Sequence, residues 1–508
     1  MPMLFSSLVP NKNLHNLSIA ELNTKILEYN EGELTNTKAI LVQTGTFTGR
    51  SPDDKFFVND NLTQNTIDWG GFNHQINENH YQKLKADMIA FANTHILYSR
   101  DMFASTAKKH QLNLRIFSQT AYHNLFAANM FIQPDDFQLN SFIPEYTIIH
   151  LPTFFANPEY HGTKNKNFSV FNLTEKIILV GGTAYTGEIK KGIFSIFNFI
   201  LPQKDVLSLH SSAVKSQNGE TALLIGLSGT GKTTLSSDPN RTFIGDDEIA
   251  WDEKGIFNLE GGCYAKTINL DQNNEPLIWN AIKKNALIEN CAFFPNTNVI
   301  DYTNTSISQN TRVSYKLSHL PKISNNEYEN HPKHIIFLTA DAFGVLPPIS
   351  KLTHKQAIEQ FLIGYTAKLA GTEMGVKEPK PTFSPCFGAP FMPLHPLKYA
   401  KILANKLEKH KPTVWLINTG WIGGSYGVGN RISISTTRSF INDILNNNFD
   451  KATFKTEEFF DFQIPTENIS QGNEIIFQED IWKDKTLYAL KIKELRSLFD
   501  KVISQFSI

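Results

Sequence analysis

The stretch from residue 221 to 248 constrains the fold most, because it holds a complete phosphate-binding loop between two apolar segments. The consensus G-x-x-x-x-G-K-[ST] is met at every fixed position by Gly226-Leu227-Ser228-Gly229-Thr230-Gly231-Lys232-Thr233. An apolar run, residues 221–225, precedes the motif, and a helix-compatible run follows from Thr233. The stretch therefore predicts a strand, a P-loop and a helix in that order.

The composition of this loop follows from the chemistry of phosphate binding. Its glycines allow a tight turn whose backbone N–H groups point at phosphate oxygens, and the start of the next helix adds a positive dipole end. Lys232 can reach the β- and γ-phosphates, and the Thr233 hydroxyl can ligate magnesium. A bound nucleoside triphosphate is the expected ligand.

Two adjacent carboxylates follow the P-loop. Thr242-Phe243-Ile244 is a short apolar strand candidate that ends in Gly245-Asp246-Asp247-Glu248. An acidic residue at the end of such a strand is how many nucleotide enzymes hold the metal on a triphosphate. Aspartates are also common in surface turns, so this alternative stays open for the pair taken alone.

Composition sets limits on the remaining function classes. A length of 508 residues suggests about two to four domains, and 41% hydrophobic with 19% charged residues describes a folded chain. The net charge of -1 gives no reason to expect nucleic acid or an anionic membrane as partner. No apolar run approaches the roughly 18 residues of a membrane span. Cys263, Cys291 and Cys386 form no C-x-x-C pair, so we predict a cytoplasmic protein without disulfides.

Coarse periodicity predicts alternating helices and strands. Helical patterns cover residues 18–29, 82–95, 119–132 and 355–369, and Ser18 with Glu21 forms a capping-box pattern. Strand patterns cover residues 39–42, 146–151, 176–180, 206–214, 333–340 and 413–418.

Four basic or imidazole side chains upstream of the P-loop are candidates for binding anions or metals. Arg50 lies in a loop of small residues that suits bidentate carboxylate binding, although a solvated surface turn is the alternative. Lys190 and Lys191 occupy the first turn of a predicted helix, where positive charge is disfavoured, so they either mark a site or are solvated. His210 lies on the polar face of the strand before the P-loop, where a purely structural histidine is the alternative.

Further candidates for phosphate contact lie beyond the P-loop. They are Lys266 in GGCYAK and Arg312 in NTRVSY, both by residue type alone. Arg431 follows a glycine-dense stretch, residues 420–429, that allows close approach of the backbone to a ligand. A flexible surface loop is the alternative for that stretch.

Ten sequence blocks occur in one order. They are TGRSPDDK, GEIKKG, LHSSA, GLSGTGKTTLS, IGDDE, EGGCYAK, NTRVSY, FLTADAFGVLPP, GTE followed by PTFSPCFGAPF, and NTGW followed by RISISTTR. With these blocks the chain resembles the ATP-dependent phosphoenolpyruvate carboxykinases from about Thr44 to Arg438. The resemblance is weaker in the tail, where residues 463–480 match poorly.

The resemblance implies a fold and a reaction. The fold would be α/β with two domains, a substrate-side domain over residues 1–205 and a P-loop domain over residues 206–508. The second domain would carry an inserted lobe at roughly 304–423, and the active-site cleft would lie between the domains. The reaction would be the gluconeogenic conversion of oxaloacetate and ATP to phosphoenolpyruvate, carbon dioxide and ADP by a carboxy-lyase. We expect Mn²⁺ at the substrate, Mg²⁺ with ATP, and a monomer.

The resemblance also implies roles for single residues. Arg50 would bind the substrate carboxylate and Tyr185 would lie beside the substrate, while Lys191, His210 and Asp247 would ligate Mn²⁺. Lys232, Thr233 and Asp246 would serve the triphosphate and its Mg²⁺. The catalytic set also includes Lys190, Ser228 and Arg312, with Arg312 near the γ-phosphate. The remaining nucleotide contacts would be His210, the P-loop residues Gly226, Leu227, Ser228, Gly229, Thr230, Gly231 and Thr234, and Lys266, Glu275, Arg431, Ile432 and Thr437.

Two alternative functions remain open from the sequence. A bacterial P-loop protein kinase of the related type would share the nucleotide half, but it would not account for TGRSP or GEIKKG. A nucleotide-dependent switch protein without chemistry would not need the candidate metal ligands.

Overall fold

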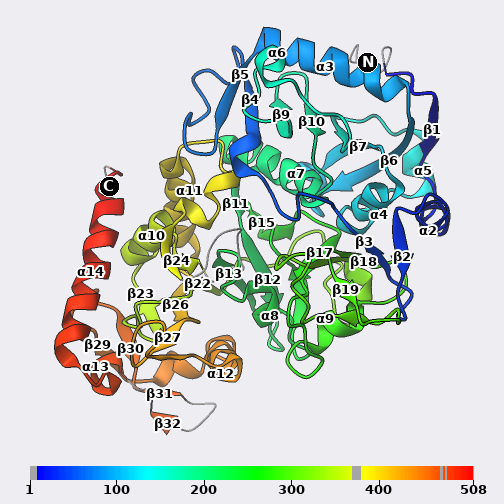
Figure 1. Cartoon of the computed structure of the whole chain (residues 1–508). Helices are drawn as coiled ribbons and strands as arrows, with labels where there is room; N and C mark the ends of the chain where they lie inside the picture. The colour runs from blue at the N-terminus through cyan, green and yellow to red at the C-terminus, as the bar shows by residue number, and fades with distance from the viewer. Residues whose placement is uncertain (1–7, 369–378, 469–472, 475–476, 507–508) are drawn as a thin grey trace. The chain divides into compact units, whose positions relative to one another are not determined.

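The computed structural model describes residues 8–368, 379–468, 473–474 and 477–506 (Figure 1). Contacts between Cα atoms divide the chain into two compact units, each assembled from three separate segments. The first unit comprises Met1–Ile200, Asn258–Pro321 and Pro390–His395, and the second comprises Leu201–Phe257, Lys322–Ala389 and Pro396–Ile508.

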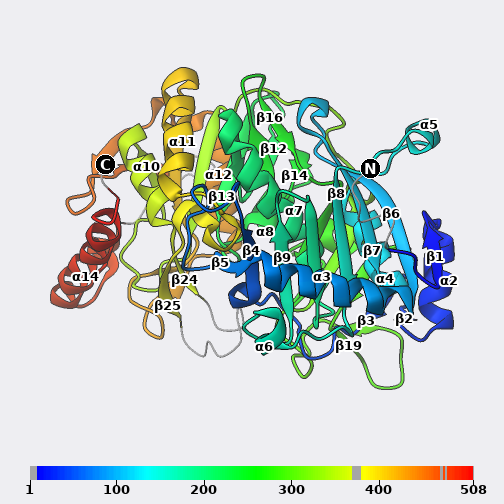
Figure 2. The ribbon, with the colours of Figure 1, turned by 90° about the horizontal axis from the view of Figure 1, so that it is seen from above.

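The first unit is built around a mixed sheet. Its order is β1 (Lys12–His15), β6 (Ile96–Ala104), β7 (Leu112–Ser118), β8 (Tyr146–Leu151), β10 (Ile177–Gly181), β9 (Phe168–Asn172), β4 (Lys55–Asn59) and β5 (His74–Asn77). Helix α3 (Glu78–Asn93) packs beside this sheet (Figures 1 and 2). Leu84 and Met88 of the helix enter one core with Val58 and Leu179 of the strands. Strands β8 and β10 inside the sheet are nearly continuous apolar runs, and all of their residues are buried.

A second sheet explains why residues 258–321 belong to the first unit. It runs in the order β17 (Gly262–Lys266), β21 (Arg312–Lys316), β18 (Leu287–Glu289), β3 (Ile40–Val42) and β2 (Gly32–Leu34). Strand β18 pairs in parallel with β3, so backbone hydrogen bonds join chain segments about 250 residues apart. The remaining elements of this unit are α2 (Ile19–Glu28), α4 (Ala121–Met130), α5 (Asp136–Asn140), α6 (Pro158–His161), α7 (Gly187–Ile200), α9 (Pro276–Ala281), β19 (Ala292–Phe293) and β20 (Ile300–Asp301).

The second unit is built around the sheet that carries the P-loop. Its order is β14 (Thr242–Gly245), β12 (Ser211–Lys215), β13 (Thr221–Gly226), β22 (His334–Thr339), β26 (Thr413–Asn418), β23 (Ile349–Leu352), β30 (Gln463–Pro465) and β29 (Phe454–Thr456). Strands β13, β22 and β26 are parallel, so their carboxyl ends meet at one edge. Leu224, Ile336 and Ile417 of these strands share a core with Phe440 and Ile444 of helix α12 (Ile434–Leu445).

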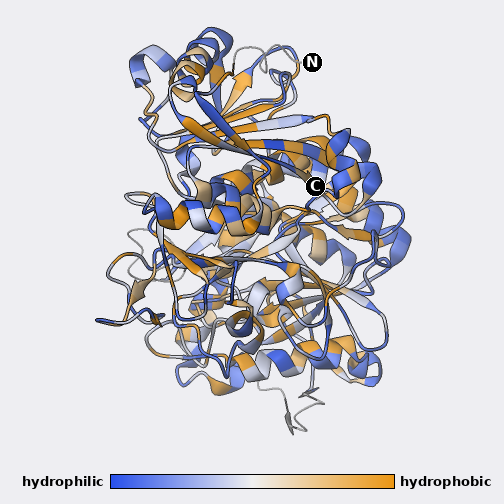
Figure 3. Ribbon diagram, turned by 90° about the vertical axis from the view of Figure 1, so that its right-hand side faces the viewer, coloured by the Kyte–Doolittle hydropathy of each residue, from blue (hydrophilic) through white to orange (hydrophobic). Residues whose placement is uncertain are grey.

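Smaller elements complete the second unit. The short sheets are β11 (Leu207–Leu209) with β15 (Ile249–Trp251) and β16 (Ile256–Asn258), β24 (Tyr365–Lys368) with β25 (Lys380–Phe383), β27 (Trp421–Ile422) with β28 (Asn430–Arg431), and β31 (Glu467–Asn468) with β32 (Asn473–Glu474). The other helices are α8 (Lys232–Ser236), α10 (His354–Ile363), α11 (Pro396–His410), α13 (Gln478–Ile481) and α14 (Lys485–Ile503). Several helices carry both hydrophobic and hydrophilic residues, as expected for elements buried on one side (Figure 3).

The compact units differ from the two continuous segments expected from the sequence. The expected boundary at residue 205 lies close to the first crossing between units, at residues 200 and 201. However, residues 258–321 and 390–395 return to the first unit, because their strands and loops pair with it rather than with the P-loop sheet. The expected division into functional domains stays a prediction: residues 1–205, and residues 206–508 with an inserted lobe at roughly 304–423.

Three local predictions show how well pattern alone places elements. The helix expected over residues 18–29 is α2, and its capping box of Ser18 and Glu21 is present. The strands expected over residues 146–151 and 413–418 have these bounds as β8 and β26. The strand expected over residues 206–214 is instead two strands in two sheets, β11 and β12, separated at His210. No helix in the described part of the chain is long and apolar enough to cross a membrane.

Candidate active site

The P-loop connects β13 to the short helix α8. Gly229 and Gly231 have φ angles of 89° and 95°, which side-chain-bearing residues rarely adopt. Lys232 is buried, and its Nζ atom donates a hydrogen bond of 2.7 Å to the carbonyl of Gly226. Ser228 lies exposed within the loop. The loop thus closes on itself as a phosphate-binding turn does, with its lysine at the inner side.

Asp246 is a buried carboxylate beside the P-loop helix. Its Oδ2 atom accepts a hydrogen bond of 2.9 Å from Thr233 Oγ1, and its Oδ1 atom accepts one of 2.6 Å from Ser212 Oγ. Only 2% of Asp246 is exposed. The structure therefore brings together Thr233 and Asp246, the pair predicted to serve the magnesium of the triphosphate, and adds Ser212 as an anchor.

Asp247 faces His210 and the P-loop lysine. Its Oδ1 atom lies 2.7 Å from His210 Nε2 and 3.8 Å from Lys232 Nζ. The φ angle of Asp247 is 75°, a left-handed conformation that costs energy for a residue with a side chain. Because such conformations persist only where the surroundings enforce them, this backbone turns the two adjacent aspartates to different partners.

The hydrogen bonds of His210 show which ring nitrogen is available to a metal. Nδ1 lies 2.8 Å from the carbonyl oxygen of Phe387, and a carbonyl only accepts, so Nδ1 carries a proton. In the neutral ring, Nε2 then presents its lone pair toward the Asp247 carboxylate. Two acceptors at this distance need a proton or a cation between them. Imidazole and carboxylate donors fit a transition-metal ion, so the two side chains suit the predicted Mn²⁺ site.

The rest of the predicted metal set is not gathered within this unit. Within residues 8–368, 379–468, 473–474 and 477–506, no three His, Cys, Asp or Glu side chains form a metal-binding group. The third predicted ligand is a lysine, Lys191, which belongs to the first unit. Its place in the donor set stays a prediction.

A hairpin next to the P-loop carries two predicted nucleotide contacts. Arg431 on β28 donates from Nε to the carbonyl of Thr419 at 3.2 Å, and its guanidinium lies 5.6 Å from the ring centre of Trp421. Thr419 in turn donates to the carbonyl of Thr230 in the P-loop, at 3.1 Å. Ile432 follows Arg431 and is buried. These contacts tie the hairpin to the P-loop.

Helix α12 carries the last predicted nucleotide contact of this unit. Thr437 is buried in its first half, where its hydroxyl donates to the carbonyl of Ser433 at 3.1 Å. Arg438 donates to the carbonyl of Thr234, the residue two positions after the P-loop lysine, at 3.2 Å. The helix is therefore fastened to the start of α8.

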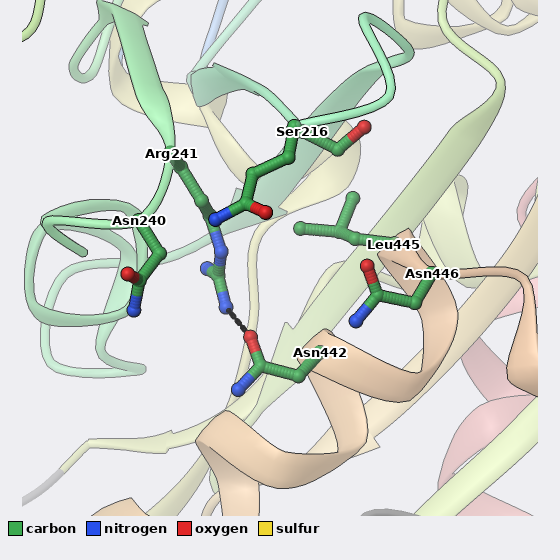
Figure 4. Close-up of a pocket in the computed structure, with 7 residues that line it drawn as sticks. Ser216, Asn240, Arg241, Asn442, Leu445 and Asn446 are labelled. Carbon is green, nitrogen blue, oxygen red and sulfur yellow. Dashed lines mark hydrogen bonds between the residues drawn. The ribbon is translucent and has the colours of Figure 1, made fainter.

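A cavity of about 250 Å³ lies at the other end of α12 (Figure 4). Arg241 crosses it, donating from Nη2 to Asn442 Oδ1 at 2.6 Å and from Nη1 to the carbonyl of Leu235 at 2.9 Å. Burial lowers the pKa of Arg241 to about 10. Its lining residues are Ser216, Gln217, Asn240, Arg241, Asn442, Leu445 and Asn446, and no predicted site residue is among them. The hydrogen bonds of Arg241 therefore connect α12 to α8 and to the segment that follows it.

Tyr185 belongs to the first unit, where two buried histidines hold the backbone before it. His150 Nε2 lies 2.8 Å from the carbonyl oxygen of Thr183, and His123 Nε2 lies 2.9 Å from that of Ala184. Both nitrogens must donate, because carbonyl oxygens only accept. Burial lowers the pKa of His150 to about 4, and it also lowers the pKa of His123, beside its neighbour. Both rings are thus neutral donors that fix the loop carrying Tyr185.

The two lysines of GEIKKG have different surroundings. Lys190 is almost fully buried, and its Nζ lies 2.8 Å from Glu260 Oε1 in an ion pair between two side chains that are each 1% exposed. Lys191 is partly exposed, and its Nζ lies 4.9 Å from the ring centre of Phe194. The structure thus gives Lys190 a partner inside the protein and leaves Lys191 nearer to the surface.

Arg50 and Lys191 flank one aromatic ring. The Arg50 guanidinium carbon lies 4.2 Å from the ring centre of Phe391, and Lys191 Nζ lies 4.7 Å from the same centre. Such cation–π contacts place both positive groups against the same aromatic ring. The prediction of a solvated Arg50 in a plain surface turn does not describe this arrangement.

The loop of Arg50 is anchored by buried polar groups. Lys55 Nζ donates to Asn73 Oδ1 at 3.0 Å and to the carbonyl of Pro390 at 2.6 Å. Burial, with Arg50 nearby, lowers the pKa of Lys55 to about 7. Burial also raises the pKa of Glu188, whose carboxylate accepts from the backbone N–H of Ser51 at 3.4 Å. These contacts hold both the Arg50 loop and the segment of Phe391.

Three more predicted nucleotide contacts lie in the second sheet of the first unit or next to it. Lys266 on β17 and Arg312 on β21 are directly opposite each other. Arg312 donates from Nε to Asn310 Oδ1 at 3.1 Å and from Nη1 to the carbonyl of Tyr264 at 3.3 Å. Glu275 directly precedes α9 and belongs to neither β17 nor β21. The sheet therefore presents two cations side by side.

The predicted residues thus fall into two groups, one in each unit. Ser212, Glu260, His123 and His150 support them and were not predicted as site residues. Ser212 could have been found, since it shares the polar strand face of His210. Glu260 lies in the block EGGCYAK, but nothing in that block shows that it pairs with Lys190. The two histidines act through backbone carbonyls, for which sequence carries no signal.

Comparisons with known proteins show the family of the chain. The family model described as phosphoenolpyruvate carboxykinase matches residues 11–472. The chain belongs to this family. It is 47% identical over 494 residues to a Flavobacterium johnsoniae protein named phosphoenolpyruvate carboxykinase (ATP), covering 97% of this chain and 92% of that protein. A Christiangramia forsetii protein of the same name is 46% identical over 501 residues, covering 98% and 94%. One from Caldanaerobacter subterraneus is 46% identical over 493 residues, covering 97% and 94%.

Family membership confirms the resemblance drawn from the ten blocks. The match also extends it, since it begins before Thr44 and continues past Arg438.

Proposed function

We propose that this protein is an ATP-dependent phosphoenolpyruvate carboxykinase. It converts oxaloacetate and ATP to phosphoenolpyruvate, carbon dioxide and ADP, a carboxy-lyase reaction of gluconeogenesis. The observation that carries the proposal is the grouping of His210 and Asp247 beside the P-loop lysine, within a chain of this family. A site for triphosphate alone needs Asp246, but it does not need this second donor pair.

The phosphoryl-transfer half of the reaction rests on the P-loop. Lys232 would leave the Gly226 carbonyl for the β- and γ-phosphates, and Thr233 and Asp246 would hold Mg²⁺ when the triphosphate is bound. Arg312 neutralises charge on the γ-phosphate as it moves to the acceptor. Such transfer depends mainly on positioning and charge neutralisation, so these few cations carry most of the effect.

The decarboxylation half needs positive charge at the substrate. Arg50 binds a carboxylate of oxaloacetate by its two parallel N–H donors, and Tyr185 packs beside the substrate. The bond from C3 to the departing carboxylate breaks, and its electron pair forms the enolate of pyruvate. The enolate oxygen then attacks the γ-phosphorus as the bond to ADP breaks. His210 and Asp247, with the deprotonated amine of Lys191 as a further ligand, would hold Mn²⁺, which would supply Lewis-acid charge for the enolate oxygen.

Exclusion of water is the second requirement. A proton delivered to the enolate would give pyruvate instead of phosphoenolpyruvate, so the acceptor must be shielded until transfer. Tyr185 is 3% exposed, and the hydrogen bonds to Thr183 and Ala184 hold its loop in place.

We further propose a monomeric cytoplasmic enzyme.

Product formation tests the proposed function directly. The purified protein with ATP, oxaloacetate and Mn²⁺ should form phosphoenolpyruvate and ADP in equal amounts. Hydrolysis of ATP without phosphoenolpyruvate would contradict the proposal, and transfer of phosphate to a protein would favour the P-loop kinase alternative. A switch protein would bind ATP and form neither product.

A variant of the donor pair separates binding from chemistry. Asp247→Asn keeps the shape of the side chain but removes its charge from the proposed Mn²⁺ site. We expect kcat to fall by about a hundredfold or more, with ATP affinity kept within a few-fold. The matched control is Asp238→Asn, a carboxylate 3.4 Å from Arg241 in the same unit and outside the proposed site. Equal activity of Asp247→Asn and the wild type would rule out this role.

A further inference from the structure

Glu289 is a buried carboxylate with no role in the reaction as proposed so far. It is the last residue of β18, and none of its surface is exposed. Burial raises its pKa to about 7, against the effect of two hydroxyl donors and of Arg312. A buried carboxylate is costly unless its oxygens are satisfied, so its partners show what it is for.

The two partners of Glu289 come from different parts of the chain. Oε1 accepts a short hydrogen bond from the hydroxyl of Thr186, and Oε2 accepts one of 2.9 Å from the phenol of Tyr264. Each carboxylate oxygen therefore binds one hydroxyl. An amide could not replace this group, because its single oxygen can serve only one of the two donors in the same way.

Thr186 connects Glu289 to the substrate side. It directly follows Tyr185 and directly precedes Gly187, the first residue of α7, which carries Lys191. The rings of Tyr185 and Tyr264 are also neighbours, with centres 6.2 Å apart. Any shift of Glu289 would therefore reach Tyr185 along the backbone through Thr186 and across the ring contact with Tyr264.

Tyr264 connects Glu289 to the phosphate side. Arg312 donates to the backbone carbonyl of Tyr264 at 3.3 Å, and its guanidinium lies 5.2 Å from the centre of the Tyr264 ring. Arg312 is also the residue directly opposite Glu289 in the pairing of β21 with β18. Residues opposite each other in a sheet place their side chains on the same face. The carboxyl group of Glu289 thus lies on the face that Arg312 uses.

We propose that Glu289 is a positioning residue that fixes Tyr185 and Arg312 relative to each other through Thr186 and Tyr264. This inference rests on the proposed function, because it assigns the two fixed groups to substrate and γ-phosphate. Glu289 itself touches neither ligand. Its effect is on geometry: it sets the distance between the group beside the phosphate acceptor and the group that neutralises the moving phosphate.

The first test is Glu289→Gln, with each substrate varied separately. We expect kcat/KM for oxaloacetate to fall by about tenfold to a hundredfold, because one hydroxyl loses its acceptor and Tyr185 and Arg312 lose their fixed spacing. The KM for oxaloacetate should rise, while ADP affinity stays within about twofold, because the P-loop contacts are untouched. Unchanged kinetics would overturn the inference. A fall in kcat with the KM for oxaloacetate unchanged and a lower melting temperature would also overturn it, since that indicates only a loss of folded protein.

A second pair of variants covers the case in which Glu289→Gln fails to fold. Thr186→Val removes the hydroxyl with nearly constant volume and should raise the KM for oxaloacetate as Glu289→Gln does. Thr186→Ser keeps the hydroxyl and should restore KM to within about twofold of the wild type. Equal behaviour of the valine and serine variants would overturn the inference, because the hydroxyl would then be irrelevant.

The matched control uses another tyrosine–glutamate pair in the same unit. Glu175 accepts from the phenol of Tyr81 at 2.7 Å and from Lys85 Nζ at 2.8 Å, and it belongs to no group described above. Glu175→Gln should leave the KM for oxaloacetate and the affinity for ADP unchanged. The wild type is assayed first: if it forms no phosphoenolpyruvate, the proposed function fails, whereas an active wild type with unchanged Glu289 and Thr186 variants refutes only the positioning role.

Discussion

Single buried side chains decide where the charged groups of the proposed site stand. Lys190 is held by Glu260, Asp246 by Ser212, and the backbone before Tyr185 by His123 and His150. In each case the hydrogen bond is formed inside the protein, where losing one partner leaves the other unsatisfied. The positions of the reactive groups are therefore more sensitive to these neighbours than to changes on the surface.

The pH dependence of stability tests the neutral state of His150. Its pKa is about 4 in the folded protein and near 6.5 in an unfolded chain. Because the folded pKa is depressed, the unfolded chain takes up the proton first as the pH falls below about 6.5. Stability is lost progressively down to about pH 4, and between pH 7 and 4.5 this one group removes about 2 to 3 kcal/mol.

We expect the variant His150→Gln to show a weaker pH dependence than the wild type over this range. The measurement is the free energy of unfolding of both proteins at pH 7 and pH 4.5. Other buried groups, such as Glu31, whose pKa is raised to about 7, titrate in both proteins and cancel in the comparison. Parallel pH profiles for the two proteins would show that His150 does not titrate in this way.

Among the elements, helix α7 depends on its first residue. A Cβ atom at Gly187 would lie 2.5 Å from a ring carbon of Tyr185, which is closer than real side chains approach. We expect Gly187→Ala to displace the Tyr185 ring and to raise the KM for oxaloacetate about tenfold, with ADP affinity unchanged. Steady-state kinetics and calorimetry measure the two quantities.

The same change at Gly192, later in α7, provides the control. A Cβ atom there would meet the flexible end of Ile178 at 3.2 Å, and alanine is the better helix former by about 1 kcal/mol. Gly192→Ala should keep the wild-type KM for oxaloacetate. If both alanine variants behave alike, contact with Tyr185 is not the reason for glycine at residue 187.

Elements set by local pattern could be predicted, and elements set by distant partners could not. The capping box that begins α2 and the buried run of β8 are complete in their own sequence. The strand pattern of residues 206–214 continues through His210, but the chain changes sheets there, and its ring binds a carbonyl 177 residues away. Helix α10 ends at Ile363, and Gly364, with a φ angle of 54°, is its C-cap. The pattern predicted that this helix would continue to residue 369, which lies outside the described residues.

The same distinction applies to the candidate site. The P-loop, with Thr233 near Asp246, follows from a motif whose spacing fixes its geometry. Glu289 and Tyr264 meet Thr186 only because β17, β21 and β18 form one sheet. No periodicity in the sequence indicates that pairing. The groups proposed to react were therefore predictable from motifs, and the groups that hold them were not.

For the molecule as a whole, neither compact unit is a continuous stretch of chain. The expected substrate-side domain, residues 1–205, lacks β17, β21 and β18, so β3 would lose its parallel neighbour. We expect a fragment of residues 1–205 to lack a cooperative urea transition and the near-ultraviolet circular dichroism of packed aromatic rings. The full chain measured beside it is the control. A sharp transition in the fragment would show that the first unit does not need residues 258–321.

Because Pro390–His395 belongs to the first unit, this unit cannot be completed until late in translation. A ribosome adds about 5 to 20 residues per second, so about 10 to 40 s separate the synthesis of residue 200 from that of residue 395. During this interval Arg50 is made but Phe391, whose ring its guanidinium meets in the finished protein, is not. The loop proposed to bind substrate is therefore among the first parts translated and among the last to be completed.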